Sequence, residues 1–98
     1  MNEDQAKTIL SQIGGPTVAA ISGGRWSLVE GTLFLPIAGG YSVEIDLYND
    51  LYNVRRVFKR GTQKWVKGER KGVYCDQISD VAYDASSYVN VEWGKLEV

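Results

Sequence analysis

Residues 41–48 alternate between apolar and polar side chains, and this alternation constrains the fold more than any other feature of the chain. An extended backbone would bring its apolar residues to one side. Asn49 and Asp50 then provide turn chemistry, and residues 52–60 continue as an antiparallel partner. The sequence therefore predicts a β-hairpin over residues 41–60. Its buried side is expected to carry Tyr41, Val43, Ile45 and Leu47.

Helical patterns are predicted on both sides of this hairpin. The first helix spans residues 2–13, where Asn2 caps the first turn together with Gln5, and residues 14–16 (Gly-Gly-Pro) end it. A second helix is predicted from about residue 73 to residue 85. Its buried face is expected to consist of Tyr74, Ile78, Val81, Ala82 and Ala85.

Short extended segments fill most of the remaining chain. Strands are predicted at residues 17–22, 26–29, 32–35, 63–67 and 88–93, and loops at 36–40 and 68–72. Adjacent strands without helices between them are typical of antiparallel meanders. The sequence therefore predicts a single α+β domain over residues 1–98. It contains a meander sheet of about four to five strands, with an N-terminal and a C-terminal helix.

Composition excludes several classes of protein. The 98 residues, 44% hydrophobic and 23% charged, suit one compact globular domain. The chain has no histidine and no phosphate-binding glycine motif, so we expect no enzyme, no catalytic residue, no cofactor and no metal. No apolar run approaches the roughly 18 residues of a membrane span, and the polar N-terminus does not resemble a signal peptide.

Positive charge is concentrated in residues 55–71. This segment holds eight of the eleven lysines and arginines and one acidic residue, which gives it a charge of +7 against −8 elsewhere. Trp65 lies among these lysines and is a candidate interface anchor. We therefore expect the partner-binding residues to be Arg55, Arg56, Lys59, Arg60, Lys64, Trp65 and Lys67.

Three interpretations of this basic segment follow from its chemistry. An acidic protein surface would complement its charge. A nucleic acid would suit it equally, because lysines contact phosphates and aromatic rings stack on bases. A hairpin whose lysines only cover the sheet and prevent edge pairing is the third. Arg25 and Trp26, which follow a glycine pair, form a second and weaker candidate contact.

Aspartates recur every four residues near the C-terminal helix, at positions 76, 80 and 84. A solvated helix face is the simplest interpretation of this stripe. A metal site completed by Glu44 and Asp46, or an acidic DNA mimic, are the alternatives. Cys75 is expected to be a structural, partly buried thiol because the chain lacks a histidine that would activate it.

Several short motifs occur in a familiar order along residues 9–88. They are IGG at 13–15, ISGG at 21–24, LFLP at 33–36, a hairpin over 43–57 and VYCDQI at 73–78. This layout resembles small proteins of bacteriophages, prophages and plasmids that read LGG, TGA, LxFxLP, hairpin and VYxDxL. The resemblance implies a mobile-element origin, a host-cytoplasmic location and no catalytic motif. It leads us to expect a non-enzymatic accessory protein that binds a host protein or protein–nucleic acid complex.

One target class follows from the same resemblance and from the small size of the chain. We expect the accessory protein to act as an inhibitor of a bacterial defence complex, in the manner of an anti-CRISPR protein. The alternative function is a nucleic-acid-binding module that uses the basic segment 55–71. Neither expectation involves a membrane.

Overall fold

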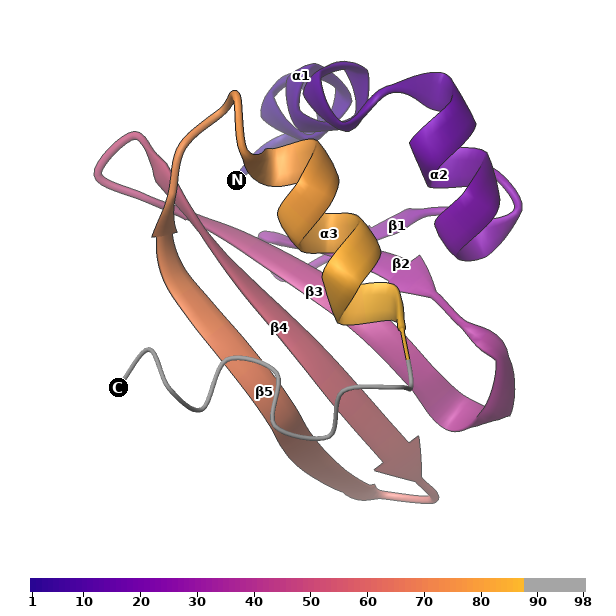
Figure 1. The fold of residues 1–98 in the computed structure, drawn as a ribbon. Coiled ribbons are helices and arrows are strands. Elements are labelled where there is room, and N and C mark those ends of the chain that lie inside the picture. The colour runs from indigo at the N-terminus through magenta and orange to yellow at the C-terminus, as the bar shows by residue number, and fades with distance from the viewer. Residues whose placement is uncertain (88–98) are drawn as a thin grey trace.

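The computed structural model describes residues 1–87 of the chain (Figure 1). Five strands form one antiparallel sheet in the order β1-β2-β3-β4-β5, and three helices pack on one of its faces. This α+β architecture with a meander sheet confirms the predicted fold class. The elements are α1 (Glu3–Ile13), α2 (Gly15–Ser22), β1 (Ser27–Val29), β2 (Thr32–Pro36), the 3₁₀ turn η1 (Ala38–Gly40), β3 (Tyr41–Tyr48), β4 (Leu51–Arg60), β5 (Gln63–Val73) and α3 (Ile78–Ser86).

The predicted central hairpin is confirmed as β3 and β4. Their register places Ile45 opposite Val54, and Tyr48 opposite Leu51 at the turn. Asn49 and Asp50 form that turn with positive φ angles of 50° and 64°, which these two residue types tolerate better than most. The alternation in residues 41–48 therefore predicted the strand, and the Asn49–Asp50 pair predicted its turn.

The core lies between the helices and the sheet face that they cover. Val43, Ile45 and Val54 contribute fully buried side chains from the two central strands. The helices close this core with Ala6, Ile9, Ile13, Val18, Ile21, Ile78, Val81, Ala82 and Ala85. The predicted N-terminal capping box is present, since Asn2 and Gln5 each accept a hydrogen bond from the other's backbone N–H.

Residues 17–22 form part of helix α2, so the prediction of a strand there was wrong. Pro16 lies in the first turn of α2, where its missing N–H leaves no helical hydrogen bond unmade. Gly23 ends the helix in the left-handed conformation, with φ of 66°. A short apolar run fits a buried strand or a buried helix equally well, and packing against β2 and α3 decided the outcome.

Strand β5 is longer than predicted, because it continues through residues 68–72, which were expected to form a loop. Two irregularities in its pairing with β4, one at Lys67 and one at Lys71 and Gly72, let the strand continue through this stretch. Helix α3 consequently begins at Ile78 rather than at Val73. The predicted final strand, residues 88–93, lies outside the described residues.

The late start of α3 also changes the environment of two residues in the preceding turn. Tyr74 is 58% exposed, although its spacing predicted a buried position. Cys75 is exposed, so the prediction of a partly buried thiol was wrong. Both residues precede the helix and therefore do not share its buried face. Within residues 1–87, no helix is long and apolar enough to cross a membrane.

Candidate partner-binding surface

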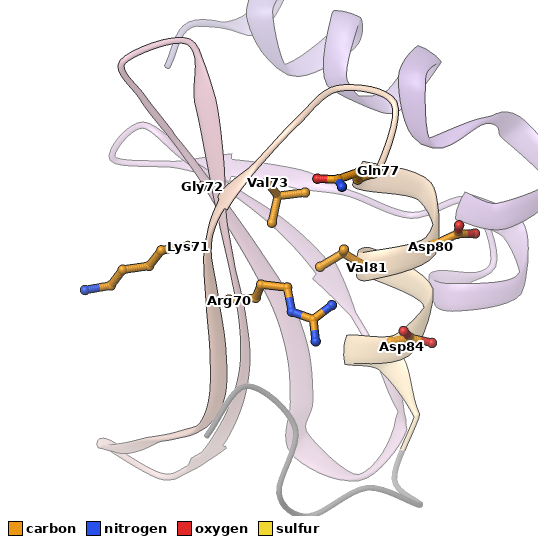
Figure 2. Close-up of a pocket in the computed structure, with 8 residues that line it drawn as sticks. All are labelled: Arg70, Lys71, Gly72, Val73, Gln77, Asp80, Val81 and Asp84. Carbon is orange, nitrogen blue, oxygen red and sulfur yellow. The ribbon is translucent and has the colours of Figure 1, made fainter. Parts of the chain in front are cut away.

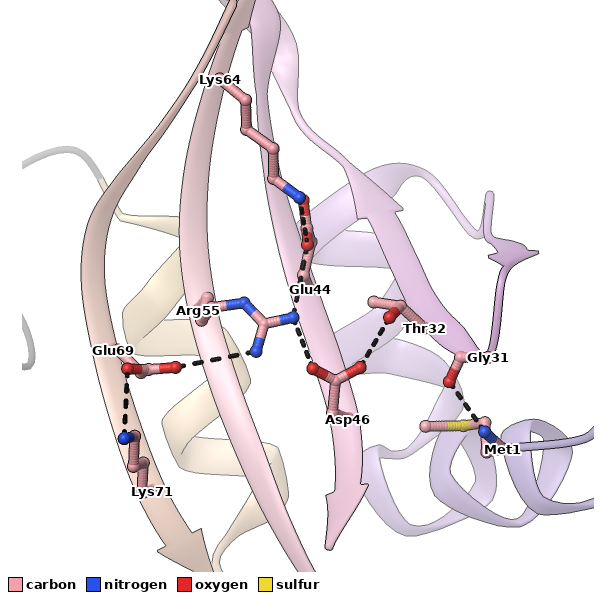
Figure 3. A network of polar contacts seen from close by, with 9 residues as sticks. All are labelled: Met1, Gly31, Thr32, Glu44, Asp46, Arg55, Lys64, Glu69 and Lys71. Atoms are coloured by element: carbon pink, nitrogen blue, oxygen red, sulfur yellow. Dashed lines mark hydrogen bonds and ion pairs between the residues drawn. The ribbon is translucent and has the colours of Figure 1, made fainter.

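The basic segment occupies β4 and β5, and its side chains divide between the two faces of the sheet. Alternation along β4 places Arg55, Val57 and Lys59 on the face that no helix of residues 1–87 covers. We call this side the open face; Figure 3 views it directly. Arg56 and Phe58 point to the other side, where the helices lie.

Arg55 is held in ion pairs on the open face (Figure 3). Its guanidinium lies 2.6 Å from an Asp46 oxygen, 3.4 Å from Glu44 and 3.7 Å from Glu69. Burial lowers the pKa of Arg55, but the two carboxylates on β3 outweigh burial and hold the pKa above its ordinary value. The structure thus commits Arg55 to the sheet instead of presenting it as a free cation.

Glu44 is the buried centre of this charge network. It is 1% exposed, and one carboxylate oxygen lies 3.0 Å from the Lys64 ammonium as well as 3.4 Å from Arg55. A buried carboxylate is costly unless it is paired, and here the pairs come from β4 and β5. Sequence reasoning missed this role; the signal was the acid–base pairing of Glu44 opposite Arg55 in the hairpin register.

Asp46 extends the network toward β2. Partial burial raises its pKa, but hydrogen bonds from the Thr32 hydroxyl at 2.6 Å and from Arg55, together with the charge of Arg55, lower the pKa below its ordinary value. A carboxyl group of this kind stabilises the folded state above its unfolded pKa of about 4. That contribution is lost as the pH falls through the lower, folded-state pKa.

We therefore expect Asp46→Asn to lower the melting temperature at pH 7, and to lower it by a smaller amount near pH 2. The substitution removes a charge that is present only above the folded-state pKa. Thermal melts followed by circular dichroism at both pH values measure the difference. Asp50→Asn, in the exposed β3–β4 turn, is the matched control. An equal loss for Asp46→Asn at both pH values would contradict the expected linkage.

Arg56 lies in the interior on the helix-covered side. It is 3% exposed, sits opposite Val43 and Gly68 in the sheet register, and donates a hydrogen bond to the Ser87 carbonyl oxygen. This contact joins the end of α3 to the middle of β4. Of the seven predicted contact residues, Arg55 and Arg56 are therefore integrated into the fold, and the other five lie at the surface.

The five surface residues lie together at the end of the β4–β5 hairpin that is farthest from α1 and α2 (Figure 1). We call residues 58–67 the hairpin tip. The tip contains no acidic residue, and Trp65 and Val66 are 40% and 54% exposed. Its exposed cationic residues are Lys59, Arg60, Lys64 and Lys67.

Aromatic contacts fix the tip relative to the sheet. The ring of Phe58 stacks on Trp65 with centroids 5.6 Å apart and lies 4.8 Å from the ring of Tyr41. On the open face, the ammonium groups of Lys59 and Lys64 lie 5.4 Å and 5.9 Å from the ring centre of Phe34. These cation–π distances orient both lysines over the sheet.

Gly40 allows the chain to pass close to the base of the tip. A Cβ atom at this position would lie 2.8 Å from the Lys59 carbonyl oxygen and 3.3 Å from the Phe58 ring. Its φ of 85° is also a conformation that favours glycine. The turn before β3 thus packs directly against β4, which gives the tip a rigid support.

The aspartate stripe lies on the exposed side of α3 and the turn before it, as predicted. Asp80 and Asp84 line one side of a groove of about 420 Å³ between α3 and β5 (Figure 2). Arg70 points from β5 toward α3, whereas Lys71 points away from it. Within residues 1–87, no group of three or more acidic or cysteine side chains is arranged to hold a metal ion.

The second aromatic candidate does not form a comparable surface. Trp26 is half-buried and packs against the core, and the Arg25 side chain donates a hydrogen bond to the Ser22 carbonyl oxygen at 3.2 Å. The hairpin tip is therefore the candidate site of this protein. Comparisons with protein-family models, with curated proteins and with solved structures found no match, so the tip is interpreted from its geometry.

Proposed function

We propose that this protein is a non-enzymatic binding protein that attaches to an acidic surface of a partner protein through its hairpin tip. The observation that carries this proposal is the arrangement of the tip. Trp65 and Val66 are exposed on opposite faces of the tip and are flanked in the sequence by Lys64 and Lys67, with no acidic residue between positions 58 and 67. Exposed apolar side chains bordered by charged ones are typical of protein interfaces, and tryptophan is frequent among their anchor residues.

The distribution of charge favours a protein partner over a nucleic acid. The open face carries Glu44, Asp46 and Glu69, which pair with the cations beside them. Phosphate binding along this face would therefore encounter acidic groups, and a continuous cationic track would be limited to the short tip. The stack of Phe58 on Trp65 favours single-stranded nucleic acid as the second candidate, because exposed aromatic rings stack on bases.

The partner that we propose is a host protein complex. This part of the proposal rests on the resemblance to small proteins of bacteriophages, prophages and plasmids. An accessory protein of a mobile element benefits from binding and inhibiting a bacterial defence complex, of which a CRISPR effector is one candidate. The acidic surface required by the tip is the physical criterion that such a target must meet.

Affinity capture from bacterial lysate, with and without nuclease, tests the proposal. We expect a captured protein that survives nuclease treatment. Arg60→Glu and Lys67→Glu should each slow association with it about threefold or more at low salt, because they reverse charge at the rim. Trp65→Ala should instead accelerate dissociation. Lys7→Glu on α1 is the matched control, since Lys7 is also an exposed cation but lies away from the tip.

Two results would overturn the proposal. Loss of every partner after nuclease treatment would support nucleic-acid binding instead, with an affinity that falls steeply with salt on any sequence. Unchanged capture by all three tip variants would show that the cations only cover the sheet.

A further inference from the structure

The outer edge of β5 is the longest unpaired strand edge in residues 1–87. Among the strands of residues 1–87, the 11 residues of Gln63–Val73 have β4 as their neighbour, whereas the opposite edge of the sheet, β1, has three residues. Backbone N–H and C=O groups that point outward from such an edge are available to another extended chain. Residues 63–67, which form the β5 part of the tip, are all exposed.

A row of aromatic side chains crosses the sheet and ends at this edge. Tyr41 lies opposite Phe58, and Phe58 lies opposite Trp65, so the three rings share one face. Adjacent centroids are 4.8 Å and 5.6 Å apart. Trp65 ends the row with 40% of its surface exposed. An apolar side chain on an added strand would continue this row, because cross-strand neighbours stabilise a sheet by packing together.

The rows on the open face end at the same edge with different chemistry. Lys59 lies opposite Lys64, so two cations stand side by side, and Glu44 on β3 is the one carboxylate that the Lys64 ammonium contacts among residues 1–87, at 3.0 Å. Val57 lies opposite Val66, and Val57 is fully buried whereas Val66 is 54% exposed. An acidic side chain on the open face of an added strand would lie beside Lys64 and balance the remaining positive charge of this lysine pair.

A second copy of this chain is a poor occupant for the edge. Pairing two β5 strands would bring Lys64 and Lys67 of one copy close to the same lysines of the other. Like charges across neighbouring strands are destabilising, and edge lysines are a common device against self-pairing. The same charges favour an acidic strand, so charge selects between these two occupants.

We propose that residues 63–67 of β5 bind an extended acidic segment of the partner protein as a sixth strand of the sheet. The segment alternates apolar side chains, which pack beside Trp65, with acidic side chains, which lie beside Lys64. Backbone hydrogen bonds supply affinity, and the alternating side chains supply selectivity. This inference rests on the proposed function, because it specifies how the hairpin tip contacts its partner.

A capped octapeptide of alternating glutamate and valine is the probe, with binding to the full chain measured by calorimetry. Two N-methylated versions carry the methyl groups on alternate amides, one set in each version. Strand addition predicts that the version methylated on the amides that face β5 loses affinity about tenfold or more, because those amides can no longer donate hydrogen bonds to the β5 carbonyl oxygens. The version methylated on the other amides should stay within about twofold of the parent peptide. A peptide of alternating lysine and valine should not bind.

Trp65→Ala tests the side-chain part of the inference. It should weaken binding of the glutamate–valine peptide about tenfold, because the aromatic row loses its outer ring. Tyr83→Ala, which removes a ring that is 54% exposed on α3, is the matched control and should leave the affinity unchanged. Equal affinities for the two N-methylated peptides, or no binding of the parent peptide, would overturn strand addition.

Measurements on the complex with the partner captured from lysate distinguish this inference from the proposed function. Hydrogen exchange of the complex should show slowed exchange at alternate amides of residues 63–67. A captured partner that depends on Arg60 and Trp65 but leaves these amides unprotected would overturn strand addition and leave the proposed function standing. Failure to capture any nuclease-resistant protein would overturn the proposed function itself.

Discussion

Ile45→Asp should remove a large part of the protein's folding stability. Ile45 is fully buried on β3, opposite Leu33 of β2 and Val54 of β4. The substitution removes a buried apolar side chain and places a carboxylate among apolar neighbours. We expect the free energy of unfolding to fall by about 5 kcal/mol, which is a large part of the stability of a domain of this size. Urea denaturation followed by circular dichroism measures this loss.

The control for this variant lies three residues further along the same strand. Tyr48 is 66% exposed at the end of β3, so Tyr48→Asp introduces the same carboxylate where water solvates it. We expect its free energy of unfolding to change by less than about 1 kcal/mol. If Ile45→Asp were as stable as Tyr48→Asp, the assignment of Ile45 to the covered face of the sheet would be incorrect.

Arg56→Glu should destabilise the fold strongly, although Arg56 belongs to the basic segment. Its side chain is 3% exposed and donates to the Ser87 carbonyl oxygen at the end of α3. A glutamate cannot make this bond and would place a negative charge in the same buried position. We expect the free energy of unfolding to fall by about 3–5 kcal/mol, as measured by thermal and urea denaturation.

Arg60→Glu makes the same charge reversal at an exposed position of the same strand. We expect it to change stability by less than about 1 kcal/mol while it weakens partner capture. The two variants therefore separate a structural arginine from a contact arginine. A stable Arg56→Glu protein that loses its partner would contradict this division and would return Arg56 to the binding surface.

Local patterns in the sequence were sufficient for the elements whose signals are strong over short distances. Alternation over residues 41–48 and the Asn49–Asp50 turn predicted the central hairpin, because side-chain direction in a strand has a period of two. The capping residues Asn2 and Gln5 predicted the start of α1 for a similar reason, since their hydrogen bonds are local. The concentration of positive charge likewise placed the tip residues together before the fold was known.

Contacts between distant residues decided what the local patterns left ambiguous. Residues 17–22 became a helix and residues 68–72 a strand, because packing against α3 and pairing with β4 outweighed weak local preferences. Tertiary contacts also decided the environment of the charged residues. The +7 of residues 55–71 is a property of the sequence, but tertiary structure paired Arg55 with carboxylates of β3 and buried Arg56.

The sequence by itself therefore determined the α+β meander, its central hairpin and the basic character of the β4–β5 region. These features depend on side-chain period, turn chemistry and composition, which act over a few residues. Only the tertiary structure decided which cations remain at the surface. An ion pair such as Lys64 with Glu44 joins residues 20 positions apart, and the sheet register alone brings them within 3.0 Å.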